Sequence, residues 1–426
     1  MKHLSKILIL FYITICSLPF YWIIEGDFKN KRSLIEYRTL EPFPTLPEED
    51  FKMGIRYLFQ AHPVEGWKTF GGEFLPGRYQ SAFEIALSDH FPLRSTGIRL
   101  ANDFNRLKIK LVYAPLNRIA NPADMRKTGI YVSTEDSTLF YAPRQVAIKR
   151  EFIDNTLEIY RAIINTHPQI NIYVYSIELI EHSLANPLNI NYPNGDAGRS
   201  LAYFAENIPE GLTLGTFTVN DFDEYQDYFY RTDHHWNIYG ALKGYKEIYR
   251  MLAKNYPEIS PRIEPKGFYT FPDFEFHGSL ARFTLYKIQP GDSFTIPIID
   301  LPAHRVLDEE GNRIDIHKRA EYHSGEYSVT PFTDHYVEYF GWNPQFYMYE
   351  FENNADRNLL LIGDSHASSI RRLLASHYQH TYAVDVRNQP EGYFSLSDFL
   401  LKYEVDDVLF IGGPYQTINH DYVIAP

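Results

Sequence analysis

Cysteine is almost absent from this 426-residue chain, and basic residues are outnumbered by acidic ones. The single cysteine, Cys16, excludes an intrachain disulfide and a cysteine-ligated zinc site. Lys and Arg total 41 against 54 Asp and Glu, so the net charge is −13, which argues against nucleic acid as the main partner. Aromatic residues make up 16% of the chain. That excess suits a carbohydrate-facing protein, but it fits a tyrosine-rich core equally well.

The N-terminus carries an uninterrupted apolar run at residues 7–24, ILILFYITICSLPFYWII. At ~1.5 Å per residue this run spans about 27 Å as a helix, close to the hydrocarbon thickness of a bilayer. No small-x-small cleavage site follows it, so an uncleaved anchor at 1–24 is favoured over a signal peptide. We expect a stalk or linker at 25–80, where Pro and charged residues are frequent, and an exported α/β domain at 81–426.

The remaining pattern predicts an α/β fold. Apolar residues at helical spacing predict helices at both sides of Pro92, at 149–167, at 237–254 and at 367–378. Apolar or alternating runs predict a hairpin within 129–143 and buried strands at 171–177, 358–362 and 407–411. Helices alternating with buried strands indicate a parallel sheet. Residues 265–350 are rich in turns and short strands, and we expect them to form a β-rich insertion.

A Gly-Asp-Ser-His segment lies between the strand at 358–362 and the helix predicted after it. Ser365 would thus sit at the carboxyl edge of the sheet, where open α/β sheets bind their ligands. The backbone N–H groups at the start of the helix can stabilise an oxyanion. The alternative is that Asp364 and Ser365 only cap the helix.

The segment Asp233-His234-His235-Trp236 supplies a base and an acid for such a serine. In an extended segment, Asp233 and His235 point to the same side, so the carboxylate can orient the imidazole. His234 would then face away and be structural. Two alternatives remain: a metal site built by these residues with His366, or a structural turn with Trp236 as a core anchor.

These motifs together resemble the DHHW proteins, which belong to the SGNH hydrolase-like superfamily, and more distantly the alginate O-acetyltransferases. The likeness rests on YRTDHHWNIYGALKGY at 229–245, LLLIGDSHASSI at 359–370, FEIALSDHFPLR at 83–94 and NIYVYSI at 171–177. The resemblance implies a three-layer α/β sandwich with a parallel central sheet. It assigns Ser365 as nucleophile, His235 as base and Asp233 as orienting acid. The Gly and Asn of the family's oxyanion hole are not clearly matched, because Gly412-Gly413 has no nearby Asn partner.

Further oxyanion or substrate candidates lie near the two motifs. They are Asp364, His366, Gly278, Ser279, Arg387 and Trp236. Gly278-Ser279, in FHGSLARF, resembles a recurrent element of the family. Trp236 is the aromatic residue that can be placed nearest the proposed base, where it would serve as a sugar platform.

The resemblance implies a membrane-anchored, extracytoplasmic O-acetyltransferase that acts on a cell-surface or secreted polysaccharide. An integral-membrane partner would deliver the acyl group, and no cofactor or metal is required. Two other functions remain open: a carbohydrate esterase with the same triad, and a non-catalytic export or assembly factor. The residues do not separate transferase from esterase, because both use one triad and differ in water exclusion and acceptor binding.

Overall fold

The computed structural model describes residues 32–33, 38–41, 85–86, 88–90, 94–113, 115, 129–134, 136–327, 329–330, 333–343, 345–389, 393–419 and 423–425. Two compact units are distinguished, Met1–Leu107 and Lys108–Pro426, and each is described by itself. The predicted anchor at 1–24 and most of the predicted stalk lie outside the described residues. Within the described ranges, no helix combines the length and the apolar character needed to cross a bilayer.

The first unit contains few described elements. Strand β1 (Arg32–Ser33) pairs antiparallel with β2 (Arg38–Thr39), both within the predicted stalk. The helix predicted after Pro92 is present as α5 (Arg94–Lys108), which continues as the π-helical turn η2 (Ile109–Tyr113) at the start of the second unit. The predicted domain start at residue 81 stays a prediction, because residues 81–84 lie outside the described ranges.

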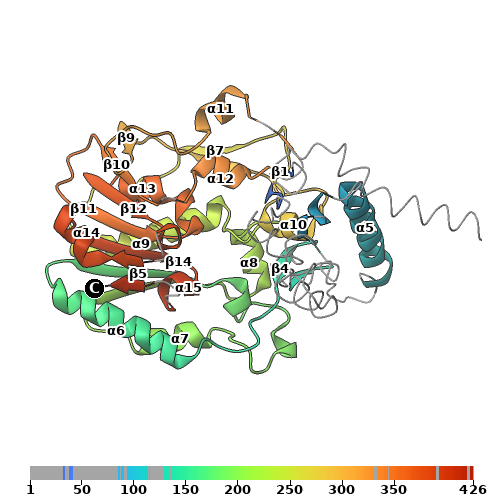
Figure 1. Ribbon diagram of the computed structural model, residues 1–426, viewed down its shortest axis with the longest axis horizontal. Coiled ribbons are helices and arrows are strands. Elements are labelled where there is room, and N and C mark those ends of the chain that lie inside the picture. The colour runs from blue at the N-terminus through green and yellow to red at the C-terminus, as the bar shows by residue number, and fades with distance from the viewer. Residues whose placement is uncertain are drawn as a thin grey trace, which may run out of the picture. The chain divides into compact units, whose positions relative to one another are not determined.

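A seven-stranded sheet forms the centre of the second unit (Figure 1). Five neighbouring strands are parallel: β6 (Leu212–Phe217), β5 (Asn171–Ile177), β14 (Asp407–Gly412), β11 (Asn358–Gly363) and β12 (His380–Val384). Strands β10 (Tyr347–Phe351) and β9 (His304–Leu307) extend the β12 edge with antiparallel pairing. The predicted parallel sheet is therefore confirmed.

Helices cover both faces of the sheet, which makes three layers. One face packs against α9 (Ile238–Asn255) and α13 (Arg371–Ala375). The other face packs against α6 (Arg150–Thr166), α7 (Arg199–Glu206) and α14 (Leu396–Lys402). Every residue of β11 and of β14 is buried, and alternate side chains join opposite cores, as expected for strands covered on both faces.

Short elements complete the second unit. They are β3 (Ile130–Val132), β4 (Leu139–Tyr141), η5 (Ile180–His182), η6 (Asn189–Asn191), α8 (Phe222–Tyr228), β7 (Gly267–Thr270), α10 (Ser279–Thr284), β8 (Thr295–Ile298), α11 (Arg319–Ser324), α12 (His335–Phe340), η7 (Ser365–Ser369), η8 (Val386–Asn388), β13 (Tyr393–Ser395), α15 (Pro414–Thr417) and β15 (Val423–Ala425). The hairpin predicted within 129–143 is β3 and β4.

Two predictions differ from the structure. The single helix predicted at 367–378 is a 3₁₀ helix, η7, followed by the short α13, because the loop is tied to the Asp364 carboxylate from its first turn. The stretch 265–350 is β-rich only in part, and its strands β9 and β10 belong to the central sheet, while its treatment as an insertion stays a prediction. Its helices α10 and α12 carry residues that contact the candidate site described next.

Candidate active site

Ser365 directly follows the central strand β11 and begins η7, at the carboxyl edge of the parallel strands. The preceding Asp364 fixes this turn. One of its oxygens accepts from the backbone N–H of His366 at 2.9 Å, and the other accepts from the backbone N–H of Gly413 at 3.0 Å. Ser365 itself is partly exposed. Two adjacent strand ends, those of β11 and β14, are therefore joined through one carboxylate directly beside the serine.

Asp233 and His235 lie in the loop that precedes α9. Asn237 caps the N-terminus of this helix, because its side chain accepts from the N–H groups of Tyr239 and Gly240. Asp233 Oδ1 accepts from the His235 backbone N–H at 2.9 Å and lies 2.5 Å from His235 Nδ1. On the other side of the ring, His235 Nε2 lies 2.7 Å from Ser365 Oγ. The structure therefore brings together the three residues that the sequence selected, across 130 positions of chain.

The electrostatics fix the direction of these hydrogen bonds. Burial disfavours the charge of Asp233, but His235 and His234 hold the pKa of its carboxyl well below its usual range. An ionised carboxylate only accepts, so His235 Nδ1 carries the proton that is shared with Asp233. The lone pair of Nε2 then accepts from the Ser365 hydroxyl, which is the arrangement a general base requires.

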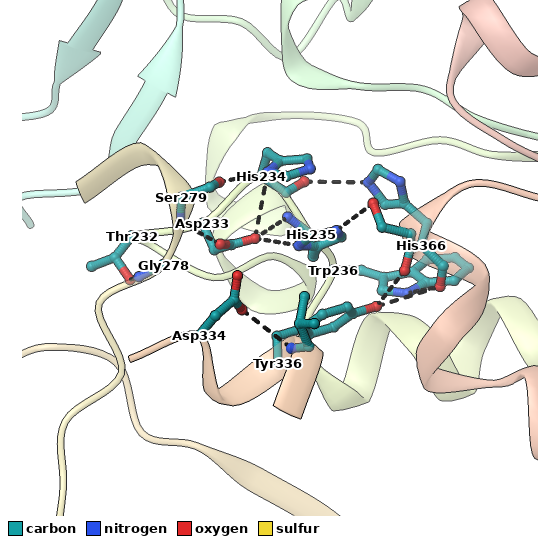
Figure 2. Close-up of polar contacts among 12 residues, drawn as sticks. Thr232, Asp233, His234, His235, Trp236, Gly278, Ser279, Asp334, Tyr336 and His366 are labelled. Atoms are coloured by element: carbon teal, nitrogen blue, oxygen red, sulfur yellow. Dashed lines mark hydrogen bonds and ion pairs between the residues drawn. The ribbon is translucent and has the colours of Figure 1, made fainter. Parts of the chain in front are cut away.

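A second polar layer holds Asp233 in place (Figure 2). Asp233 Oδ2 accepts from the backbone N–H of Ser279, which begins α10. Gly278 lies so close that a Cβ there would come within 2.2 Å of the Asp233 side chain. The Gly278 N–H donates to Thr232 Oγ1 at 3.0 Å, and the Thr232 hydroxyl donates to Asp292 at 2.6 Å. The loop before α10 thus supports the carboxylate.

Tyr336, on α12, lies flat against the imidazole of His235. The ring centroids are 4.1 Å apart and the planes differ by 9°. The Tyr336 hydroxyl donates to the backbone carbonyl of Ser365 at 3.0 Å. One buried side chain therefore contacts both the proposed base and the proposed nucleophile. Sequence reasoning missed this residue, because nothing in the local pattern at 335–340 connects it with either motif.

His234 corrects an expectation. It does not face away from the site: its ring centroid is 3.9 Å from that of His235, and its Nδ1 lies 2.6 Å from Ser279 Oγ. Burial and the neighbouring His235 lower its pKa well below the usual range. The loop bends tightly here, because the His235 N–H donates to the Asp233 carboxylate. This bend places the rings of His234 and His235 on the same side.

Two candidates from the second motif hold the Ser365 loop. Asp364 is held ionised, since His366 outweighs the effect of burial on its pKa, and a carboxylate cannot donate to an oxyanion. His366 is buried between Asp364, 3.0 Å from its Nδ1, and the His234 carbonyl, 3.4 Å from its Nε2. Both residues therefore position the Ser365 loop and link it to the loop that carries Asp233 and His235.

The other candidates also take supporting positions. Trp236 is fully buried, and its indole N–H donates to the His366 carbonyl and to Ser369 Oγ, so the proposed sugar platform at this residue is wrong. The backbone N–H groups of Gly278 and Ser279 donate to Thr232 and Asp233, respectively, as described above. Arg387 forms a two-pronged ion pair with Asp385, and its substrate contact stays a prediction.

One backbone group is a candidate oxyanion donor. Within the described residues, the Ser365 N–H has no hydrogen-bond acceptor, as expected at the first position of a helix. The Gly413 N–H, in contrast, is occupied by Asp364. The sequence predicts an oxyanion donor among the first backbone N–H groups of the helix, and the candidate in the structure is the N–H of Ser365 itself.

Asp233, His234 and His235 also form a cluster whose donor atoms lie within 4.8 Å of one another. The contacts described above already engage both Asp233 oxygens, both ring nitrogens of His235 and one of His234. A metal ion here would have to displace these hydrogen bonds. The preference for hydrogen-bonded acid–base chemistry over a metal site stays a prediction, supported by this occupancy.

Comparisons with known proteins give structural matches only. No protein-family model and no curated protein sequence matches the chain. A DHHW family protein from Eubacterium siraeum DSM 15702 matches with a TM-score of 0.52 and 15% identity, over 71% of this chain and 98% of that one. The chain has the fold of a DHHW family protein. The resemblance inferred from the motifs is thereby confirmed at the level of the fold.

Two further structures are similar. Bacillus cereus PatB1, solved with a sulfonyl adduct, matches with a TM-score of 0.52 and 18% identity, over 68% of this chain and 95% of that one. The O-acetyltransferase domain of Pseudomonas putida AlgJ overlaps with a TM-score of 0.33 and 10% identity, over 66% and 89% of the two chains. A score of 0.33 supports no inference about this chain.

Proposed function

We propose that this protein is a serine acyltransferase that moves an acetyl group to a hydroxyl of a polysaccharide. The proposal rests on one observation: Ser365 Oγ lies 2.7 Å from His235 Nε2, and His235 Nδ1 lies 2.5 Å from Asp233. A nucleophile, a base and an orienting acid in this order are the machinery of acyl transfer. A chain that served only as an export or assembly factor would have no need of this arrangement.

The first half-reaction forms an acyl-enzyme. His235 Nε2 takes the proton of the Ser365 hydroxyl while Oγ attacks the carbonyl carbon of the donor ester. The carbonyl oxygen becomes negative and accepts from the Ser365 backbone N–H. The bond to the donor's leaving group then breaks, and His235 returns the proton to that group. Ionised Asp233 stabilises the imidazolium in between.

The second half-reaction regenerates the serine. A sugar hydroxyl gives its proton to His235 Nε2 and attacks the acyl carbon. The bond to Ser365 Oγ breaks, and the same proton passes to Oγ. The acetylated sugar is released, and the enzyme returns to its starting state. If water takes the place of the sugar, the protein is an esterase with the same three residues.

The substrate and the location extend the proposal beyond the site. We propose a cell-surface or secreted polysaccharide as acceptor, because the motifs resemble enzymes of that class. The apolar run at 7–24 supports a single-pass anchor at the cell membrane with the catalytic domain outside the cytoplasm. An integral-membrane partner that delivers the acyl group follows from the same resemblance.

The test separates the three functions. Full-length protein is given 4-nitrophenyl acetate with and without a neutral oligosaccharide, and mass spectrometry follows acetylated sugar while absorbance follows ester cleavage. Acetylated sugar that disappears in Ser365→Ala supports the transferase. Cleavage without acetylated sugar identifies an esterase. Equal behaviour of wild type and Ser365→Ala in both readouts rejects an enzymatic role for the triad.

A further inference from the structure

A cavity of about 240 Å³ lies beside the triad. Four aromatic residues contribute much of its lining, namely Tyr141, Tyr225, Phe229 and Phe283. Glu181 and His234 are its acidic and imidazole members. The wall therefore combines flat apolar rings with a small number of polar groups, which is the composition of a site that fixes a ligand's orientation.

The cavity adjoins the reacting atoms on two sides. His234 lines it and packs its ring against His235, the proposed base. Leu179 lines it as well and packs against Gly413, whose N–H is held by the carboxylate next to Ser365. A molecule seated in this cavity is thus separated from the Ser-His pair by a single layer of side chains.

Three polar groups of the wall have no protein partner among the described residues. No hydrogen bond engages the hydroxyl of Tyr141, the hydroxyl of Tyr225 or the carboxylate of Glu181 in the described part of the chain. The two hydroxyls lie close to acidic charge: burial, Glu181 and Asp233 raise the pKa of Tyr141 to about 12 and also raise that of Tyr225. Both phenols are therefore protonated donors, with a carboxylate acceptor beside them.

The volume fits one ring. A cavity of about 150 Å³ is known to hold benzene, so 240 Å³ holds one six-membered ring with hydroxyl substituents but not two such rings. A single acetyl group would leave most of it empty. Tyr141 and Glu181 also line a neighbouring hollow of about 910 Å³, which gives room for further sugars of a chain.

We propose that this cavity binds one uncharged pyranose residue of the acceptor glycan and so anchors the glycan beside the triad. Aromatic faces stack on the apolar face of the ring, while Tyr141, Tyr225 and Glu181 bind its hydroxyls. No Lys or Arg belongs to the described lining of the cavity, and Glu181 repels a carboxylate, so a uronic acid is disfavoured. The proposal rests on the proposed function for the identity of the reaction, but sugar binding can be measured without it.

The experiment measures sugar binding in the full-length Ser365→Ala protein, which cannot turn over. Cellohexaose and chitohexaose are the neutral probes, and hexagalacturonic acid is the acidic probe, each titrated by calorimetry at millimolar concentration. Adding Tyr141→Phe or Glu181→Gln should weaken binding of a neutral probe by roughly 5- to 10-fold, the effect of one lost hydrogen bond. Phe283→Ala, which removes a half-exposed ring, should weaken it further.

Matched controls carry the same chemical changes elsewhere. Tyr203→Phe removes a surface hydroxyl that binds Asp154, and Glu158→Gln alters an exposed ion pair on α6. Neither should change the affinity. Circular dichroism of each variant shows whether the fold is retained, and because each Tyr→Phe or Glu→Gln change preserves shape, a loss of binding with an intact spectrum reports the site.

The outcomes separate this proposal from the proposed function. Suppose that wild type cleaves the ester, but either no neutral probe binds or the affinity is unchanged in Tyr141→Phe and Glu181→Gln. The subsite is then rejected and the triad is retained. If binding depends on both residues but cleavage is absent, the subsite stands and the triad fails. Tighter binding of the acidic probe overturns the choice of sugar. Wild type could also cleave 4-nitrophenyl hexanoate faster than 4-nitrophenyl acetate. If Phe283→Ala removes that preference, the cavity is an acyl pocket instead of a sugar subsite.

Discussion

Replacing Gly278 with alanine should disable the triad although none of its three members is itself substituted. An alanine Cβ at this position would lie 2.2 Å from both the Cβ and Oδ2 of Asp233, whereas ordinary contacts of a Cβ begin at 3.4 Å. Asp233 or the Gly278 backbone must therefore move by about 1 Å. Displacements of that size at a catalytic group cost roughly 100-fold in rate, so we expect kcat to fall by about that factor.

The same overlap also costs stability, on the order of 1–3 kcal/mol. The assay is hydrolysis of 4-nitrophenyl acetate, read as kcat and KM, together with thermal unfolding of each variant. Gly267→Ala is the matched control, because its Cβ would meet only Ile298 at 3.8 Å. A Gly278→Ala protein that keeps the wild-type kcat would show that Asp233 does not need this position, and the account of how the triad is held would then fail.

Three further outcomes follow from the structure. Asp233→Asn should lower kcat by roughly 10³- to 10⁴-fold with little change in KM, because an amide can donate to His235 Nδ1 and stabilise the wrong tautomer; an unchanged kcat would contradict this. Trp236→Phe should lower the free energy of unfolding by about 1–3 kcal/mol, since the buried His366 carbonyl loses the shortest of its hydrogen bonds, while KM for a sugar acceptor stays the same; a raised KM would restore the platform hypothesis. Burial raises the pKa of Glu178 to about 7, so its protonated form stabilises the fold below pH 4.5, and this contribution, of about 3 kcal/mol, is lost as the pH rises through 7. Urea unfolding of Glu178→Gln should show a flatter pH dependence over that range, and a profile identical to wild type would refute the assignment.

The strands that could be predicted from the sequence are those that are buried on both faces of the sheet, because such burial produces a continuous apolar run. Strands 171–177, 358–362 and 407–411 are continuous apolar runs because helices cover both sides of the parallel sheet. The antiparallel edge strands β9 and β10 carry no such pattern, since they are only partly buried. From sequence alone, these two strands therefore fall within the expected insertion at 265–350.

The candidate site also has residues that the sequence predicts and residues that it does not. Asp233, His235 and Ser365 could be selected because each lies in a short local motif. The residues that position them could not, because they approach from distant parts of the chain: Ser279 from α10 and Tyr336 from α12 contact the triad only through the tertiary fold. The aromatic excess is equally ambiguous in sequence, and in the part of the chain that the structure describes more than half of the aromatic side chains are buried in the cores.

The central claim is that Ser365 is the nucleophile, and a covalent adduct tests it most directly. A protein of this fold has been solved with a sulfonyl adduct, which makes a sulfonyl fluoride a suitable reagent. Full-length protein would be treated with phenylmethylsulfonyl fluoride, digested and mapped by mass spectrometry. We expect one modified peptide, 358–371, with the label on Ser365, loss of ester cleavage in proportion to labelling, and no label in His235→Ala. Cleavage that continues at the wild-type rate after Ser365 is labelled, or in Ser365→Ala, would contradict it.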